Sequence, residues 1–142
     1  MSRPEQINVA SAPRPLGAYS HAIRVGELLF ISGQGARDPK TGELVSPSQN
    51  SSGQYAGYDM RAHTRACIEN VKTVVESAGG SLKDVVDVTV LLINMKDFAA
   101  FNEVYEQYFR EARPARTTMA VAELPLQNVI EIKAIAYLKS GA

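Results

Sequence analysis

The segment VIEIKAIAYL, residues 129 to 138, alternates between two sets of side chains. The first set is wholly apolar and the second includes two charges: Ile130, Ile132, Ala134, Ala136 and Leu138 against Val129, Glu131, Lys133, Ile135 and Tyr137. Successive side chains of a β-strand point to opposite faces of its sheet. The pattern therefore predicts a strand with one face packed under helices, and Glu131 on the other face among apolar neighbours.

Other segments have the periods of strands and helices. Apolar stretches at 22–25 and 28–32 flank a glycine turn, which predicts a hairpin. Residues 85–94 are β-branched and apolar, as expected of an interior strand, and residues 116–124 predict one more strand before the last. A first helix is expected from the N-cap Asp59 to Gly79, and a second begins at the N-cap Asp97. The first has an apolar stripe of Cys67, Val71, Val74 and Ala78, widened by Ile68 and Val75.

The order of these segments predicts an α+β fold. Two helices and about five strands are expected to form a mixed sheet with both helices on one face. The 142 residues fit a single domain. Residues 1–16 carry three prolines and predict an extended arm, and residues 35–58 form a long irregular loop, a kind of segment that often has a function.

Charge and cysteine content exclude several classes of function. Fifteen basic and fifteen acidic residues balance, so neither nucleic acid nor an anionic membrane is an expected partner. The single Cys67 rules out an internal disulfide, and His21 and His63 lack partners at metal-ligand spacing, so no metal or cofactor is expected. The sequence contains no signal-peptide pattern and no apolar run of the ~20 residues that span a bilayer, which favours a cytoplasmic location.

Two charged residues are the main candidates for chemistry, and each has two interpretations. Glu131 is either a cross-strand ion pair on a solvated face or a carboxylate in a partly dry pocket, with a raised pKa suited to proton transfer. Arg116 follows the rigid Pro114 and either holds a substrate carboxylate through two parallel hydrogen bonds or pairs with Glu131 or Glu123.

Weaker candidates lie near the hairpin. Ser32 offers a hydroxyl, and Gly33 allows a ligand to approach the backbone closely, although the pair also fits a simple turn. Tyr19 precedes the hairpin. Cys67 is expected in the core rather than as a nucleophile, and Arg113 at the surface.

Five short motifs together resemble the RidA family, also called the YjgF family. They are GAYS (17–20), FISGQ (30–34), NMKDFAAFNEVYEQYF (94–109), RPAR (113–116) and IEIKAIA (130–136). Their order and spacing agree with the family over nearly the whole chain. The resemblance implies a chorismate-mutase-like fold that assembles as a homotrimer, with ligand sites between neighbouring subunits.

The resemblance also implies an activity and a set of site residues. Members hydrolyse reactive enamines and imines, as 2-iminobutanoate/2-iminopropanoate deaminases do, without a cofactor. By position, Arg116 corresponds to the arginine that binds the substrate carboxylate and Glu131 to the glutamate that activates water. The other pocket residues carried over are Tyr19, Ser32, Gly33 and Asn102.

The sequence departs from the family pattern in two places. The loop around residues 46–58 is longer than usual, and Thr118 stands where many members have cysteine, with a backbone still able to position water. The sequence also looks more like the 2-aminomuconate deaminase branch in three segments, DMRAHTRACIENV, RTTMAV and IEIKAIAY. The substrate of that branch is a larger dicarboxylate, which would suit a pocket reshaped by the long loop. Two alternatives stay open: a non-catalytic carboxylate-binding regulator or chaperone-like trimer, and a structural trimer whose cleft is filled by an Arg116–Glu131 ion pair.

Overall fold

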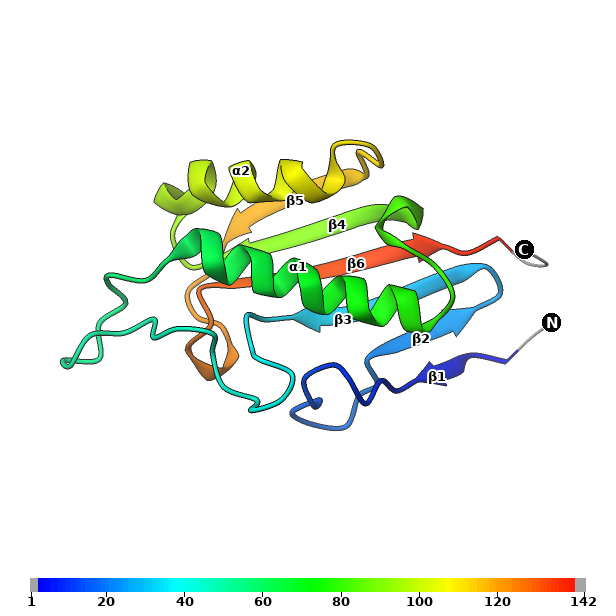
Figure 1. Ribbon diagram of the computed structural model, residues 1–142, viewed down its shortest axis with the longest axis horizontal. Helices are drawn as coiled ribbons and strands as arrows, with labels where there is room; N and C mark the ends of the chain where they lie inside the picture. The colour runs from blue at the N-terminus through cyan, green and yellow to red at the C-terminus, as the bar shows by residue number, and fades with distance from the viewer. Residues whose placement is uncertain (1–2, 140–142) are drawn as a thin grey trace.

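The computed structural model describes residues 3–139 as a six-stranded mixed sheet with two helices on one face (Figure 1). The strands are β1 (Glu5–Ile7), β2 (Ala22–Val25), β3 (Leu28–Gln34), β4 (Val85–Leu92), β5 (Ala115–Ala120) and β6 (Ile130–Tyr137), and the helices are α1 (Met60–Ser77) and α2 (Phe98–Phe109). The spatial order is β1-β2-β3-β6-β4-β5, and only β4 and β5 run parallel. This confirms the predicted α+β class.

The alternation of β6 sets the two faces of the sheet. Its predicted inner set is buried beneath the helices, together with β3 and β4 side chains such as Ile31 and Val90. Glu131 and Lys133 point to the opposite face, as the pattern predicts. Val129 differs from the prediction because it precedes the strand and is fully buried.

The helix α1 forms where the sequence predicts it. The side chain of Asp59 accepts a hydrogen bond from the backbone N–H of Ala62 and so caps the first turn. The stripe through Cys67 and Val71 packs without solvent exposure on the inner face of the sheet, and α1 lies over β3 and β6 (Figure 1). The Cys67 thiol contacts the carbonyl oxygens of Gln34 and Ile130, and burial raises its pKa. Its full burial confirms the predicted place in the core.

The helix α2 begins after a short 3₁₀ turn, Met95–Asp97. Asp97 occupies the predicted N-cap position, but its side chain caps no backbone N–H. Its Oδ2 instead accepts a 2.6 Å hydrogen bond from the hydroxyl of Tyr58 in the long loop. The predicted strand at 116–124 is also shorter than expected, because β5 ends at Ala120.

The segment predicted as an extended arm contributes a strand. Residues 5–7 form β1, which pairs antiparallel with β2 at the edge of the sheet. His21 anchors the residues that follow β1. Its Nδ1 accepts a hydrogen bond from the N–H of Val9, and its Nε2 lies 2.8 Å from the carbonyl oxygen of Pro13. Its ring is therefore occupied by structural hydrogen bonds.

The loop at residues 35–58 contains no helix or strand, as predicted, beyond two isolated bridges. It is fastened to α1 by the Oγ of Ser46, which lies 2.9 Å from Nε2 of the buried His63, and by Asn70, whose amide donates to the carbonyls of Gly35 and Arg37. Within residues 3–139, neither helix is long and apolar enough to cross a bilayer.

Candidate functional site

One group of predicted site residues gathers around Glu131 on the face of the sheet opposite the helices. In the pairing of β3 with β6, Ile31 lies opposite Ala134 and Gln34 opposite Ile132, so Ser32 and Gly33 share the one position between them. This β-bulge brings the backbone of Gly33 against the Glu131 side chain. A Cβ placed on Gly33 would lie 2.5 Å from Oε2 of Glu131 and 2.8 Å from its Cδ. A side chain at position 33 would therefore collide with the Glu131 carboxylate, and glycine avoids this collision.

The surroundings of Glu131 change its proton affinity. Burial raises the pKa of the carboxyl above its ordinary value, and the nearby Lys133 opposes the rise. A partly buried carboxylate of this kind holds a proton more tightly than an exposed one. It is therefore better matched to accepting a proton near neutral pH.

A hydrogen bond connects Ser32 to the segment that contains Tyr19. The Ser32 hydroxyl donates a 2.7 Å hydrogen bond to the carbonyl of Ser20, and its N–H donates to the carbonyl of His21. Tyr19, next to Ser20, is half exposed, and its hydroxyl accepts from the N–H of Leu16. The segment before β2 is thus tied to the bulge that carries Gly33. Tyr19, Ser32, Gly33 and Glu131 are called the glutamate half-site below.

Arg116 lies in a second group, formed by β5 and α2. Its Nη1 donates a 2.8 Å hydrogen bond to Oδ1 of Asn102. The guanidinium carbon lies 4.6 Å from the ring centroid of Tyr105, and the rings of Phe101 and Phe98 follow at 5.4 and 5.6 Å. One amide and three aromatic faces therefore fix this cation, without neutralising it.

Two hydroxyls near Arg116 are buried without a hydrogen-bond partner among the described residues, those of Tyr105 and Thr118. Burial raises the pKa of Tyr105 to about 12, with Arg116 opposing the rise, so the ring stays neutral beside the guanidinium. Thr118 is on the same side of β5 as Arg116. Arg116, Asn102 and Thr118 are called the arginine half-site.

The two half-sites lie on opposite faces of the sheet within one chain. Arg116 pairs in register with Val88, which is buried beneath the helices. Glu131 pairs with Leu91, which points to the other face together with Met119. Neither of the two salt bridges in residues 3–139 involves Arg116 or Glu131. The structure therefore brings together the residues within each half-site, but it keeps the two half-sites apart within one chain.

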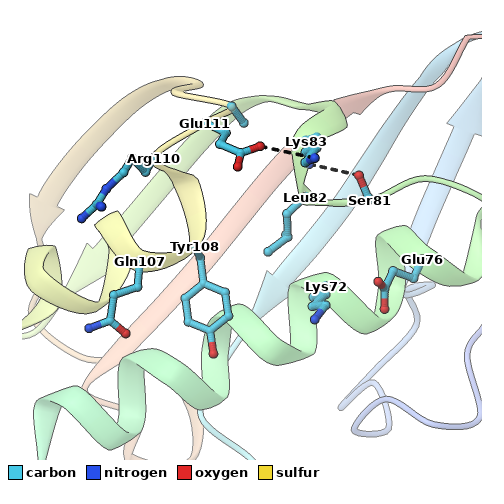
Figure 2. A pocket seen from close by; sticks show the side chains of 10 residues that line it. Lys72, Glu76, Ser81, Leu82, Lys83, Gln107, Tyr108, Arg110 and Glu111 are labelled. Carbon is cyan, nitrogen blue, oxygen red and sulfur yellow. Dashed lines mark hydrogen bonds and ion pairs between the residues drawn. The ribbon is translucent and has the colours of Figure 1, made fainter.

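Two hollows flank α2. The first, called the α2–β5 groove, has a volume of about 550 Å³ and includes Asn102, Tyr105, Glu106, Arg110, Arg113 and Arg116 in its lining. The second lies between the C-terminal parts of α1 and α2 and measures about 640 Å³ (Figure 2). It contains no predicted site residue, and its Lys83 is paired with Glu111 at 3.3 Å. The α2–β5 groove is thus the hollow connected with the arginine half-site.

Sequence reasoning missed the aromatic support of Arg116. The aromatic face of α2 was visible in the sequence as Phe98, Phe101 and Tyr105, spaced by three and four residues. That spacing alone is typical of a core-facing helix. Only the packing of α2 over β5 shows that these rings also surround a cation.

Comparison with known proteins shows the family of this chain. The model of the family described as endoribonuclease L-PSP matches residues 9–138. The chain belongs to this family, which is the RidA/YjgF family. A RutC family protein of Pyrococcus horikoshii is 48% identical over 133 residues, covering 94% of this chain and 97% of that protein.

Two other relatives carry names or ligands that bear on function. The 2-iminobutanoate/2-iminopropanoate deaminase of Homo sapiens is 38% identical over 130 residues, covering 92% of this chain and 87% of that protein. A crystal structure of E. coli TdcF with bound serine has a TM-score of 0.82 and 35% identity, and covers 95% of this chain and 99% of that one.

Proposed function

We propose that the chain is a hydrolytic deaminase that releases ammonia from enamine and imine carboxylates of the 2-iminobutanoate/2-iminopropanoate type. The observation that carries the proposal is the Glu131 carboxylate, which has a raised pKa and packs on Gly33 at a β-bulge. The human relative named as such a deaminase supports the same reaction class. Arg116, fixed and free of ion pairs in residues 3–139, supplies the charge that a substrate carboxylate needs.

The reaction follows from these groups. Arg116 holds the carboxylate of the substrate, and the carbon of the C=N bond is already electrophilic. Glu131 accepts a proton from water as the water oxygen bonds to that carbon. The imine nitrogen takes up a proton as the water adds, which gives a carbinolamine. Glu131 then returns its proton to that nitrogen, the C–N bond breaks and ammonia leaves, while the hydroxyl loses its proton to solvent and becomes the carbonyl of a 2-keto acid. Tyr19, Ser32 and Asn102 would orient the substrate and water, and Thr118 would position the water.

We propose further that neighbouring copies of the chain complete each site, as in a homotrimer. Arg116 and Glu131 face different compartments of one chain, so a ligand that meets both requires two chains. The face that carries Glu131 also exposes large apolar side chains, among them Phe30, Met119 and Tyr137. Such a surface suits contact with another copy.

Complementation between two inactive variants tests this arrangement. Arg116→Ala and Glu131→Gln are purified separately, mixed in equal amounts, dissociated and reassembled. If each site takes its arginine and its glutamate from different copies, about a quarter of the sites regain both groups. Activity that stays at the level of the separate variants, in a mixture shown to have exchanged subunits, would place both groups of each site in a single chain.

A carboxylate-binding protein without turnover is the second candidate, and one observation favours it. The serine bound to E. coli TdcF has a carboxylate but no C=N bond. Both candidates require Arg116 for binding, and only the enzyme requires Glu131 for ammonia release. Glu131→Gln is therefore assayed for ammonia release from 2-iminopropanoate and for propionate binding. Lost turnover with retained binding supports the enzyme, and unchanged turnover across pH rejects the proposed proton transfer.

Within the deaminase class, we propose 2-aminomuconate as a further substrate. The support is the motif resemblance, together with the long loop at residues 35–58, which the hydrogen bond between Tyr58 and Asp97 ties to the start of α2. A side-by-side assay of 2-aminomuconate and 2-iminopropanoate with the purified protein tests this choice. Turnover of 2-iminopropanoate alone would reject 2-aminomuconate and leave the deaminase proposal standing.

A further inference from the structure

The α2–β5 groove carries more positive charge than one substrate carboxylate needs. Three guanidinium groups line it, those of Arg110, Arg113 and Arg116, against the single carboxylate of Glu106. Neither salt bridge within residues 3–139 uses any of the three arginines. Arg116 is already assigned to the first carboxylate, so the charge of Arg110 and Arg113 remains to be explained.

Arg113 adopts a backbone conformation that is unfavourable for its side chain. Its φ is +46°, in the left-handed region, and its N–H donates a 2.9 Å hydrogen bond to the carbonyl of Phe109, which ends α2. Glycine is the usual residue at such a helix end. The following Pro114 restricts this position further. A basic residue at a helix C-terminus is favoured by the helix dipole, but an ordinary helical position in the last turn would gain the same without the strained φ.

Arg110, the residue that follows α2, lines both the α2–β5 groove and the other hollow. Figure 2 shows its guanidinium turned away from the Lys83–Glu111 pair of the other hollow. Glu106 lies four residues before it on the helix, a spacing at which the two side chains can interact. Arg113 therefore has the less compensated charge of the two, and its distance from Arg116 along the chain is at most about 11 Å.

We propose that the α2–β5 groove binds a second anionic group of the substrate, with Arg113 as the residue that recognises it. This inference rests on the proposed function and narrows its substrates: imines with two carboxylates would be preferred over those with one. Arg116 takes the carboxylate beside the C=N bond, and Arg113, with Arg110 behind it, takes the distal one. Arginine suits this role because its planar fork binds a carboxylate with two hydrogen bonds.

Arg113→Gly is the informative variant, because it removes the guanidinium and relieves the strained φ, so the melting temperature should not fall. Arg113→Lys keeps the charge, and Lys83→Ala removes one positive charge from the other hollow as the matched control. Turnover is measured on 2-iminosuccinate and 2-iminopropanoate, each generated in situ by an amino-acid oxidase. Binding is measured by calorimetry with succinate and propionate, which need no turnover.

The parent protein should have the higher kcat/KM on 2-iminosuccinate. Arg113→Gly should lower kcat/KM on 2-iminosuccinate about tenfold or more and leave kcat/KM on 2-iminopropanoate within about twofold of the parent. On 2-iminosuccinate, Arg113→Lys should fall between the parent and Arg113→Gly, and Lys83→Ala should match the parent. Succinate binding should weaken in parallel while propionate binding holds. Equal losses on both substrates, no loss on either, or a parent that prefers 2-iminopropanoate would overturn the second subsite. If the parent turns over neither imine, the deaminase proposal fails, and the subsite stands only if succinate binding still depends on Arg113.

Discussion

Gly33→Ala is the most direct test of the geometry around Glu131. The added Cβ would lie 2.5 Å from Oε2 of Glu131, whereas ordinary contacts begin near 3.4 Å. The carboxylate must therefore move by roughly 1 Å, and a displacement of that size costs about 100-fold in rate when the group positions a reacting atom. We expect kcat/KM for 2-iminopropanoate to fall between about 10-fold and 100-fold.

The fold should survive this substitution. The atom displaced is the far end of a flexible side chain, and overpacking typically costs about 1–3 kcal/mol. Replacing glycine by alanine also restricts the unfolded chain, which returns about 0.4–1 kcal/mol. The net loss in the free energy of unfolding should thus lie between about 0 and 2.6 kcal/mol. Urea titration measures this loss, and the release of ammonia measures the rate.

Gly17→Ala is the matched control, because its Cβ would lie 3.8 Å from the nearest atom, Cε1 of Tyr19, and meets no clash. Its activity should stay within about twofold of the parent. In a Glu131→Ala background, Gly33→Ala should have no further effect, because no carboxylate remains to be displaced. A folded Gly33→Ala variant with activity within about threefold of the parent would refute the reasoning that the position of Glu131 sets the rate.

Three further predictions concern stability and reactivity. Because burial raises the pKa of Glu131, the folded chain loses stability as the pH rises through the range in which this carboxyl ionises. Glu131→Gln should therefore raise the melting temperature at pH 8, by a few degrees at most, and should not raise it at pH 4. An equal effect at both pH values would contradict this. Asp59→Ala should lower the free energy of unfolding by about 1 kcal/mol in urea titration, while Asp59→Asn, which keeps the cap, should change it little. The thiol of Cys67 should react with a thiol reagent only at the rate of unfolding, and rapid labelling of the native protein would show that α1 opens locally.

The elements with clear periodicity could be predicted from the sequence. In β6 every second side chain is apolar, and α1 has an apolar stripe bounded by an N-cap and two glycines. In both elements the local pattern agrees with the observed burial. β1 could not be found in this way, because three residues show no period and the strand exists through its pairing with β2. The same holds for the end of β5: the N–H of Val121 still donates to the carbonyl of Leu92, but within residues 3–139 the strand pairing stops at Ala120.

The sequence named candidate residues for the site but could not give their arrangement. Along β5 neither alternating set of side chains in ARTTMA is consistently apolar, so alternation could not decide which face Arg116 would join. Its contact with Asn102 and the α2 rings depends on the packing of a helix over an edge strand. Gly33 was expected to admit a ligand, whereas its close contact is the Glu131 carboxylate, and the bulge that creates this contact leaves no mark in the sequence.

The neighbouring copy proposed above would account for two separate features of the chain. The face that carries Glu131 exposes Leu28, Phe30, Met119 and Tyr137 by 37–44% each, although apolar side chains of this size are normally covered. The half-sites on the two faces are each formed by local contacts, yet neither alone can both hold a carboxylate and activate water. Covering the apolar face and completing the site are then one event, because Glu131 lies on the surface that a second copy would bury. On this reasoning, dilution that separates the copies should abolish turnover while each chain retains its Asn102-bound Arg116 and its Gly33-packed Glu131.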